Sequence, residues 1–249
     1  MVGLEDKIIL ITGGAQGIGA ATAQLCAERG ATVVIADVVD EAGSATARSI
    51  TEAGGRAEFR RVDVSHEEQV QALMAGIGER YGRLNGLVAA AGVLKGAFLQ
   101  PEELPLDVFD QVLSVNVRGT YLCARYGTPL LAETGQGVMI LIASAAGVAG
   151  PSSSLAYGAS KGGVNGLGMT LANRLSSRGI RVNVLCPGEI VTGMKLSVVA
   201  AQAEREGRPV DEALERARLE MGSPEGIARV IAFLLSGEAD YVRGTLFTR

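Results

Sequence analysis

A tyrosine and a lysine stand four residues apart in the stretch AYGASK (156–161), where a helix would place Tyr157 and Lys161 on one face. A free phenol has a pKa of about 10, so it acts as a base near neutral pH only if that pKa falls by roughly two to three units. An ammonium about 4 Å away supplies about 4 kcal/mol at an effective dielectric constant of about 20, which is enough for that change. Together with the hydroxyl of Ser144 upstream, Tyr157 and Lys161 are therefore candidates for acid/base chemistry. Singly, each has an ordinary explanation as a strand-end hydroxyl, an amphipathic helix residue or a solvated charge.

The elements that must position these side chains can be inferred from short β-branched apolar runs, which alternate with longer, Ala-rich stretches. This alternation predicts βαβ units, and therefore an α/β fold with one doubly wound parallel sheet and helices on both faces. The length fits a single domain over residues 1–249. Ser144 and Tyr157 are then expected to meet at the carboxyl edge of the sheet, where open α/β folds bind ligands. The expected strands are 7–12, 32–37, 57–64, 84–91, 137–144 and 180–187.

A glycine-rich turn follows the first expected strand in ITGGAQGIGAA, with Gly13, Gly17 and Gly19 where backbone N–H groups can approach a pyrophosphate. A Cβ would block that approach, and the N-terminus of the next helix favours negative charge. The turn alone is weak evidence. Asp37, at the end of the second strand, is placed either to accept hydrogen bonds from the adenosine ribose or simply to cap the next helix.

The cofactor expected from these features is NAD. Val38 and Val39 follow Asp37, and Gln16 stands within the loop. Neither neighbourhood supplies the Arg or Lys that the 2′-phosphate of NADP would require.

Bulk properties exclude several other classes of function. A formal net charge of −4, with no basic cluster, argues against nucleic acid as a partner. His66 is the only histidine, which excludes His-dependent triads and multi-His metal sites, and it is expected to start a helix in a capping box formed by Ser65 and Glu68. The three cysteines form no C-x-x-C pair, and no apolar run reaches membrane-spanning length, so a cytoplasmic protein without a metal or a membrane partner is expected.

The segment 188–222 interrupts the alternation of strands and helices. It is charged and helix-prone, and Gly207 and Pro209 break it. Such a segment predicts either a substrate lid or a solvated excursion, and both interpretations stay open. Residues 93–100, 145–154 and 189–215 are expected to line a moderately apolar substrate pocket.

Over nearly its whole length the chain resembles the short-chain dehydrogenase/reductase family, which has a Rossmann-type fold. The matching elements are TGGAQGIG, Asp37, Asp63-Val64, AAAG (89–92), Asn116 in SVNVRG, Ser144, YGASK and PGEIVT (187–192). The resemblance implies that Tyr157 exchanges a proton with the substrate oxygen, to which Ser144 also hydrogen-bonds. It implies that Lys161 lowers the pKa of Tyr157 and that Asn116 anchors a water that conducts protons outward. The cofactor-binding residues it implies are Gly13, Gln16, Gly17, Ile18, Gly19, Asp37, Asp63, Val64, Ala91, Gly92, Tyr157, Lys161, Pro187, Gly188, Ile190 and Thr192.

Two further features bear on the resemblance. Ala89 and Ala90 stand where the family usually has amide side chains, which puts in doubt a hydrogen bond that braces neighbouring strands, while YVRGTLFTR (241–249) begins like the family's last strand. The glycine-rich helix within 155–178 and the long helix of about 106–133 are implied to form a subunit interface, so a homodimer or homotetramer is expected. Close approach of those glycines to the sheet is the alternative.

The function predicted from these features is NAD-dependent interconversion of a secondary alcohol and a ketone by hydride transfer. A 3-oxoacyl-thioester reductase is the alternative within the enzyme class, disfavoured because biosynthetic reductases typically use NADPH. A catalytically silent dinucleotide-binding protein is the alternative outside it, and such a protein does not need Ser144, Tyr157, Lys161 and Asn116 together.

Overall fold

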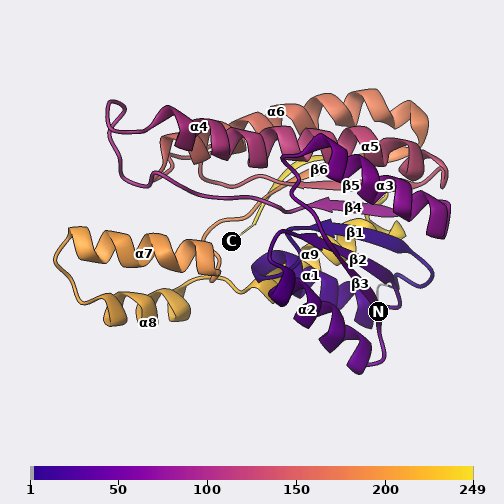
Figure 1. The fold of residues 1–249 in the computed structure, drawn as a ribbon, viewed down its shortest axis with the longest axis horizontal. Coiled ribbons are helices and arrows are strands. Elements are labelled where there is room, and N and C mark those ends of the chain that lie inside the picture. The colour runs from indigo at the N-terminus through magenta and orange to yellow at the C-terminus, as the bar shows by residue number, and fades with distance from the viewer. Residues whose placement is uncertain (1–2, 249) are drawn as a thin grey trace.

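The computed structural model describes residues 3–248, which contain a seven-stranded sheet in the order β3-β2-β1-β4-β5-β6-β7, parallel throughout (Figure 1). Chain order reverses between β1 and β4, which makes their carboxyl ends the switch point where such sheets bind ligands. The predicted doubly wound fold is confirmed, and the last strand forms as β7. The strands are β1 (Ile8–Thr12), β2 (Thr32–Asp37), β3 (Arg56–Arg61), β4 (Gly86–Ala89), β5 (Gly137–Ile142), β6 (Ile180–Cys186) and β7 (Gly244–Phe247).

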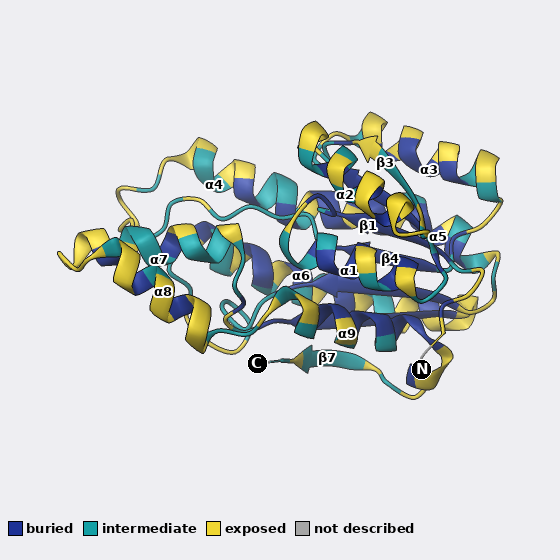
Figure 2. Cartoon of the chain, turned by 90° about the horizontal axis from the view of Figure 1, so that it is seen from below, coloured by how far each residue is buried: buried dark blue, intermediate teal, exposed yellow. Residues whose placement is uncertain are grey.

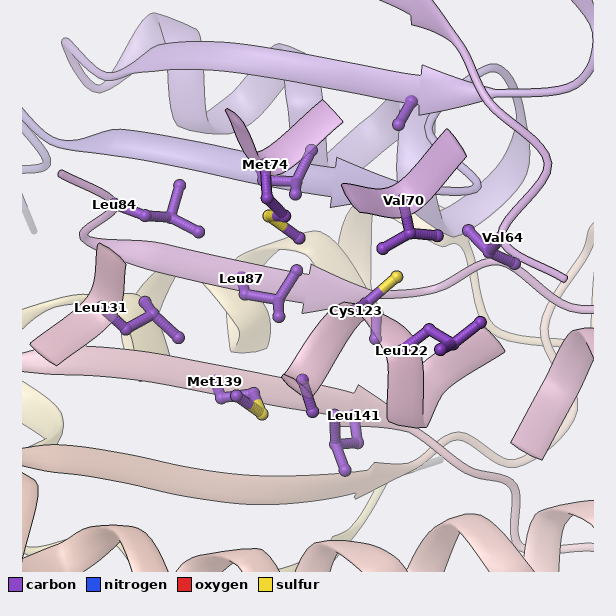
Figure 3. Close-up of a cluster of buried hydrophobic side chains, with 14 of the residues drawn as sticks. Val64, Val70, Met74, Leu84, Leu87, Leu122, Cys123, Leu131, Met139 and Leu141 are labelled. Carbon is purple, nitrogen blue, oxygen red and sulfur yellow. The ribbon is translucent and has the colours of Figure 1, made fainter. Parts of the chain in front are cut away.

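Helices cover both faces of this sheet. One buried cluster joins the sheet to α1, α2 and α9, and a second joins its other face to α3, α5 and α6. Figure 3 shows the second cluster, where Leu87 of β4 and Met139 of β5 lie among side chains of α3 and α5. The helices are α1 (Gly17–Glu28), α2 (Asp40–Glu52), α3 (Glu67–Tyr81), α4 (Leu106–Leu113), α5 (Thr120–Ala132), α6 (Leu155–Leu175), α7 (Gly193–Arg205), α8 (Val210–Glu220) and α9 (Pro224–Leu235).

The inner strands are apolar along their whole length because both of their faces are covered. Every residue of β1, β4, β5 and β6 is buried, whereas every residue of the edge strands β3 and β7 is partly buried or exposed (Figure 2). The loop after β4 is braced without the family's usual amides. Ala90 N donates to Thr12 O at 3.1 Å, and Ala91 N donates to Thr12 Oγ1 at 3.4 Å.

The long helix expected over about 106–133 forms, but with a π-helical turn (Ser114–Gly119) between α4 and α5. π-turns inside helices occur frequently at functional sites. Asn116 lies within this turn, and it is 1% exposed.

The predicted capping box before α3 is wrong. The helix begins at Glu67 with no side-chain cap from His66. Ser65 instead donates from both its N–H and its hydroxyl to Asp63 Oδ1, at 2.9 and 2.7 Å. The Ser65 N–H that the Glu68 carboxylate would accept in the box is thus taken by Asp63, and the N-cap position falls at His66, one residue later than the box requires.

The glycines of α6 do not share one role. A Cβ on Gly168 would lie 2.2 Å from Val184 Cγ2 of β6, so there the helix needs glycine to reach the sheet. A Cβ on Gly166 would meet nothing within 4 Å, and this residue is exposed. Close packing on the sheet therefore accounts for Gly168 but not for Gly166.

The 188–222 segment is a helical hairpin, α7 and α8, which projects beyond the carboxyl edge of the sheet (Figure 1). Its base is closed by a bridge between Ile190 and Gly222, with hydrogen bonds of 2.9 Å from Gly222 N to Glu189 O and from Val191 N to Gly222 O. Within residues 3–248 no helix is long and apolar enough to span a membrane, and no cluster of His, Cys, Asp and Glu is suited to a metal ion.

Candidate active site

A cavity of about 1000 Å³ opens at the carboxyl edge of the sheet, between the strand ends and α7. All of the predicted cofactor-binding residues line it, although they come from loops scattered along the chain. Ser144 lines it too, whereas Asn116 does not. The residues in question are Gly13, Gln16, Gly17, Ile18, Gly19, Asp37, Asp63, Val64, Ala91, Gly92, Tyr157, Lys161, Pro187, Gly188, Ile190 and Thr192.

The glycine-rich loop between β1 and α1 requires glycine for backbone reasons. Gly13 and Gly17 have φ of 69° and 56°, in the left-handed region that other residues avoid. A Cβ on Gly19 would lie 2.0 Å from Gly13 O, so the start of α1 packs directly on the loop. Gln16, at the N-cap, makes no side-chain capping hydrogen bond, so the first N–H groups of α1 face the cavity without a side-chain acceptor from that position. This geometry suits an anion such as a pyrophosphate.

Asp37 ends β2 at the rim of the same cavity. Its Oδ2 accepts from Ala15 N at 3.0 Å and its Oδ1 accepts from Val39 N at 3.1 Å. The carboxylate is therefore held in place by main-chain donors on both sides, and each oxygen keeps a lone pair for a ligand. It does not cap α2, whose N-cap residue is Val39.

Asp63 lies further along the same half of the cavity, after β3. Burial alone would raise the pKa of its carboxyl, but the two hydrogen bonds from Ser65 and the nearby His66 outweigh burial and lower it. Nδ1 of His66 is 3.3 Å from Asp63 Oδ2. The only histidine of the chain thus lies beside the Asp63 carboxylate, and it is not among the described residues that line the cavity.

Tyr157 is placed by the first turn of α6. Ser154 caps this helix by accepting from Tyr157 N at 3.2 Å, and its hydroxyl donates to Lys95 O at 2.6 Å. Burial raises the pKa of the Tyr157 phenol above its ordinary value, and a hydrogen bond with Ser144 offsets this only in part. The phenol therefore stays protonated at neutral pH.

Lys161 follows one turn later and is 5% exposed. Its Nζ lies 5.4 Å from the centroid of the Tyr157 ring and donates to Ile142 O, at the end of β5, at 2.7 Å. Burial lowers the pKa of Lys161 to about 8. Desolvation acts on the pKa of both groups, and the ammonium donates to the carbonyl of Ile142, so the predicted lowering of the Tyr157 pKa by Lys161 stays a prediction.

Asn116 lies behind the cavity wall and contacts the catalytic helix through Ser160. Its Nδ2 donates to Ser160 Oγ at 2.9 Å and to Val93 O at 3.0 Å, and its Oδ1 accepts from Val93 N at 2.8 Å. Ser160 in turn donates to Tyr157 O at 2.8 Å. The amide thus ties the loop after β4 to the helix that carries Tyr157 and Lys161, and the predicted role in proton conduction stays a prediction.

The other half of the cavity is largely apolar. Loop residues Val93, Leu94 and Phe98 line it with Ala145 and Ala149, as the sequence indicated. The predicted 189–215 wall ends earlier, because its lining residues reach only as far as Gln202 and α8 contributes none. Sequence reasoning assigned no role to Gln111 of α4, which also lines the cavity, and no motif singles it out.

Phe98 is held in an unusual backbone conformation at the mouth of this half. Its φ is 65°, which is an outlier for a bulky residue. Its N–H donates to Ser153 O at 2.6 Å, and Arg205 of α7 donates to its carbonyl at 2.9 Å. The Arg205 guanidinium also lies 5.1 Å from the ring centroid. The helical hairpin is therefore joined across the mouth of the cavity to the loop after β4.

Comparisons with known proteins agree with this geometry. The family model described as "Enoyl-(Acyl carrier protein) reductase" matches residues 13–248. Tropinone reductase-like 2 of Erythroxylum coca is 38% identical over 97% of this chain and 88% of its own length. Cis-4-hydroxycyclohexanecarboxylate dehydrogenase of Sinomonas cyclohexanicum is 36% identical over 97% of this chain and 94% of its own. The crystal structure of levodione reductase superposes with a TM-score of 0.89 at 33% identity, covering 98% of this chain and 95% of that one.

The burial of Lys161 predicts a pH-dependent effect on stability. Its pKa falls from 10.5 to about 8 in the folded state. Below pH 8 the lysine is charged in both states, and the folded state carries the full penalty of about 3 kcal/mol. As the pH rises from about 8 to 10.5, the folded protein loses this proton first, so the penalty disappears.

We therefore expect Lys161→Met to equal or exceed the wild type in free energy of unfolding at pH 7. Between pH 8 and 10.5 the free energy of unfolding of the wild type should rise, relative to that of the variant, by up to about 3 kcal/mol. Urea unfolding across that range measures the difference, with Lys95→Met, which removes an exposed ammonium, as the control for net charge. If the difference in free energy of unfolding between the wild type and Lys161→Met stays constant from pH 7 to 10.5, the lowered pKa of Lys161 is contradicted.

Proposed function

The chain belongs to the short-chain dehydrogenase/reductase family, and we propose that it is an NAD(H)-dependent oxidoreductase that interconverts a secondary alcohol and a ketone, with Tyr157 as acid and base. The family establishes an oxidoreductase that uses a nicotinamide dinucleotide. The observation that carries the finer proposal is one cavity in which Ser144, Tyr157 and Lys161 face the same space as the glycine-rich loop and Asp37.

The residues of the N-terminal half fit a dinucleotide. The uncapped start of α1 provides main-chain donors for the pyrophosphate, and Asp37 provides an acceptor for the ribose hydroxyls. Asp63 and Val64 would flank the adenine, while Gly92 and Thr192 lie further along the same cavity. NAD is favoured over NADP because the Asp37 carboxylate would repel a 2′-phosphate and none of the described residues that line the cavity is an arginine.

The reaction requires one proton and one hydride to move at the same carbon–oxygen group. When bound, the nicotinamide ring supplies or accepts the hydride. The Tyr157 hydroxyl exchanges the proton, and the Ser144 hydroxyl hydrogen-bonds the same oxygen and fixes its position. Lys161 stabilises the phenolate that forms when Tyr157 gives up its proton. Asn116 positions Ser160 and α6, and we propose that it also marks the exit path of the proton.

The raised pKa of Tyr157 favours one direction of this exchange at neutral pH. A buried, protonated phenol is ready to donate, whereas removal of an alcohol proton first requires the phenolate. We therefore infer that ketone reduction is the faster direction near pH 7. Oxidation would need a higher pH or further positive charge beside the ring.

The segment 188–222 is proposed as a substrate lid. Its helix α7 contributes Met194, Lys195, Val198 and Gln202 to the cavity, and Arg205 contacts Phe98 across the mouth. A segment that merely extends into solvent would neither line the cavity nor contact Phe98.

A 3-oxoacyl-thioester reductase stays the second candidate. The description of the matching family model, which names an acyl carrier protein, favours it. Asp37 disfavours it, because the acyl-thioester reductases of biosynthesis typically use NADPH. A silent dinucleotide-binding protein is disfavoured by the converging Ser144, Tyr157 and Lys161.

The central test is Tyr157→Phe. Loss of the only proton-exchanging hydroxyl should lower kcat by about 10²- to 10⁴-fold while leaving NADH affinity within about twofold. Rates are measured by NADH absorbance with a panel of cyclic ketones, hydroxysteroids and 3-oxoacyl thioesters, and affinity by fluorescence titration. Tyr241→Phe, which changes a fully exposed tyrosine, is the matched control. Full turnover by Tyr157→Phe would contradict the mechanism, and saturable NADH binding without turnover by the wild type would favour the silent binding protein.

Asp37→Asn tests the choice of cofactor. The amide keeps the shape but loses the charge, so the ratio of kcat/KM for NADH to that for NADPH should fall by about tenfold or more. Asp40→Asn, an exposed change in the first turn of α2, should leave the ratio unaltered. A wild type that already prefers NADPH would reject NAD as the cofactor and favour the thioester reductase.

We also propose a homodimer or homotetramer, with α4, α5 and α6 at an interface between copies. Leu106, Tyr121, Leu155 and Met169 are exposed apolar residues of these helices, and Leu113, Val117 and Leu167 line a shallow hollow there. Light scattering should therefore give at least a dimeric mass at micromolar concentration. Met169→Glu should shift the mass toward the monomer, whereas Leu219→Glu, on α8, should not. A monomeric wild type would overturn this proposal.

A further inference from the structure

One pair of charged side chains lines the cavity at the base of α7. The charged residues among the described lining are Asp37, Asp63, Lys161, Glu189 and Lys195. The first two belong to the dinucleotide half, and Lys161 is buried against Ile142 O. Glu189 and Lys195 are therefore the charges that a substrate would meet in the apolar half.

These two side chains satisfy each other. Lys195 Nζ donates to Glu189 Oε1 at 2.6 Å. The ammonium side chain is 32% exposed and the carboxylate side chain 67% exposed, so the carboxylate lies on the solvent side of the pair. A charge-assisted hydrogen bond of this length commits the ammonium to the protein and leaves the cavity wall electrically neutral.

Both residues are fixed by their main chains. Glu189 O accepts from Gly222 N at 2.9 Å in the bridge that closes the base of the hairpin. Lys195 N donates to Thr192 Oγ1 at 3.2 Å in the cap of α7. The pair thus spans a short turn whose main chain is anchored at both ends, which keeps the two side chains within reach of each other.

We propose that Glu189 is a specificity-determining residue, which neutralises Lys195 so that the apolar half accepts an uncharged ketone or alcohol in preference to one that carries a carboxylate. A substrate carboxylate could pair with Lys195 only by displacing Glu189, and it would then lie beside a second negative charge. An uncharged ring meets only apolar walls and a satisfied ion pair. The proposal rests on the proposed function for the chemical class of the ligand.

The experiment compares two ligands of nearly equal shape that differ in charge, cyclohexanecarboxylate and cyclohexanecarboxamide. Neither has a ketone or an alcohol to react, so calorimetric titration with and without NADH measures binding alone. The proteins are the wild type, Glu189→Gln, Lys195→Met and the double variant. Turnover of 4-oxocyclohexanecarboxylate and its methyl ester is measured in parallel.

The wild type should bind the carboxamide more tightly. In Glu189→Gln the affinity for the carboxylate, relative to that for the carboxamide, should rise by about fivefold, as expected for an ion pair at a partly exposed site. This gain should disappear in the double variant, and it should shrink as the salt concentration rises. Lys195→Met should leave the carboxylate no better bound than in the wild type.

Three results would overturn the proposal: an unchanged ratio in Glu189→Gln, the same change in the double variant, or no binding of either ligand to any of the four proteins. Binding that follows the expected pattern without turnover of either ketone would reject the proposed reaction but keep the charge selection. Turnover of the ester with an unchanged binding ratio would keep the reaction and reject the role of Glu189.

Discussion

The hydrogen bond from Lys161 Nζ to the carbonyl of Ile142 is the contact on which the arrangement of the site depends. It joins the catalytic helix α6 to the last residue of β5, in the interior, where a buried ammonium without an acceptor would be strongly destabilising. Two other contacts fix the position of α6 relative to the sheet. Ser154 caps its first turn, and Gly168 allows it to lie against Val184 of β6. Tyr157 owes its position to all three.

The electrostatics of the site follow from the same burial. Desolvation lowers the pKa of Lys161 and raises that of Tyr157, because it disfavours the charged form of each group. Such a site carries the penalty of a buried charge, as active sites commonly do. In the proposed reaction, part of that penalty would be offset when Tyr157 gives up its proton and its phenolate faces the ammonium of Lys161.

The two halves of the cavity are built differently. The dinucleotide half consists of short loops at the ends of β1, β2 and β3, each anchored by main-chain hydrogen bonds such as those to Asp37. One wall of the apolar half comes from the helical hairpin, which is joined to the rest of the chain by the bridge at its base and by the contact of Arg205 with Phe98. A loop-built half for the proposed cofactor and a separate half for the proposed substrate are consistent with a fold that serves many reactions.

The sequence by itself determined the parallel sheet with helices on both faces and the glycine-rich loop after β1, because apolar periodicity and glycine requirements are local properties. The resemblance to the family supplied the other predicted cofactor-binding residues, all of which line the cavity. The sequence also determined the candidates Ser144, Tyr157 and Lys161, since the four-residue spacing of the last two has one consequence in a helix. Only the tertiary structure decided what surrounds them. Three features depend on burial and on partners distant in sequence or across a turn. They are the raised pKa of Tyr157, the placement of Asn116 behind the cavity wall and the pairing of Glu189 with Lys195. The capping box failed for the same reason, because Asp63 accepts the N–H of Ser65 that the box would need. Desolvation and competition for hydrogen-bonding partners are set by the three-dimensional environment, and a one-dimensional pattern does not contain them.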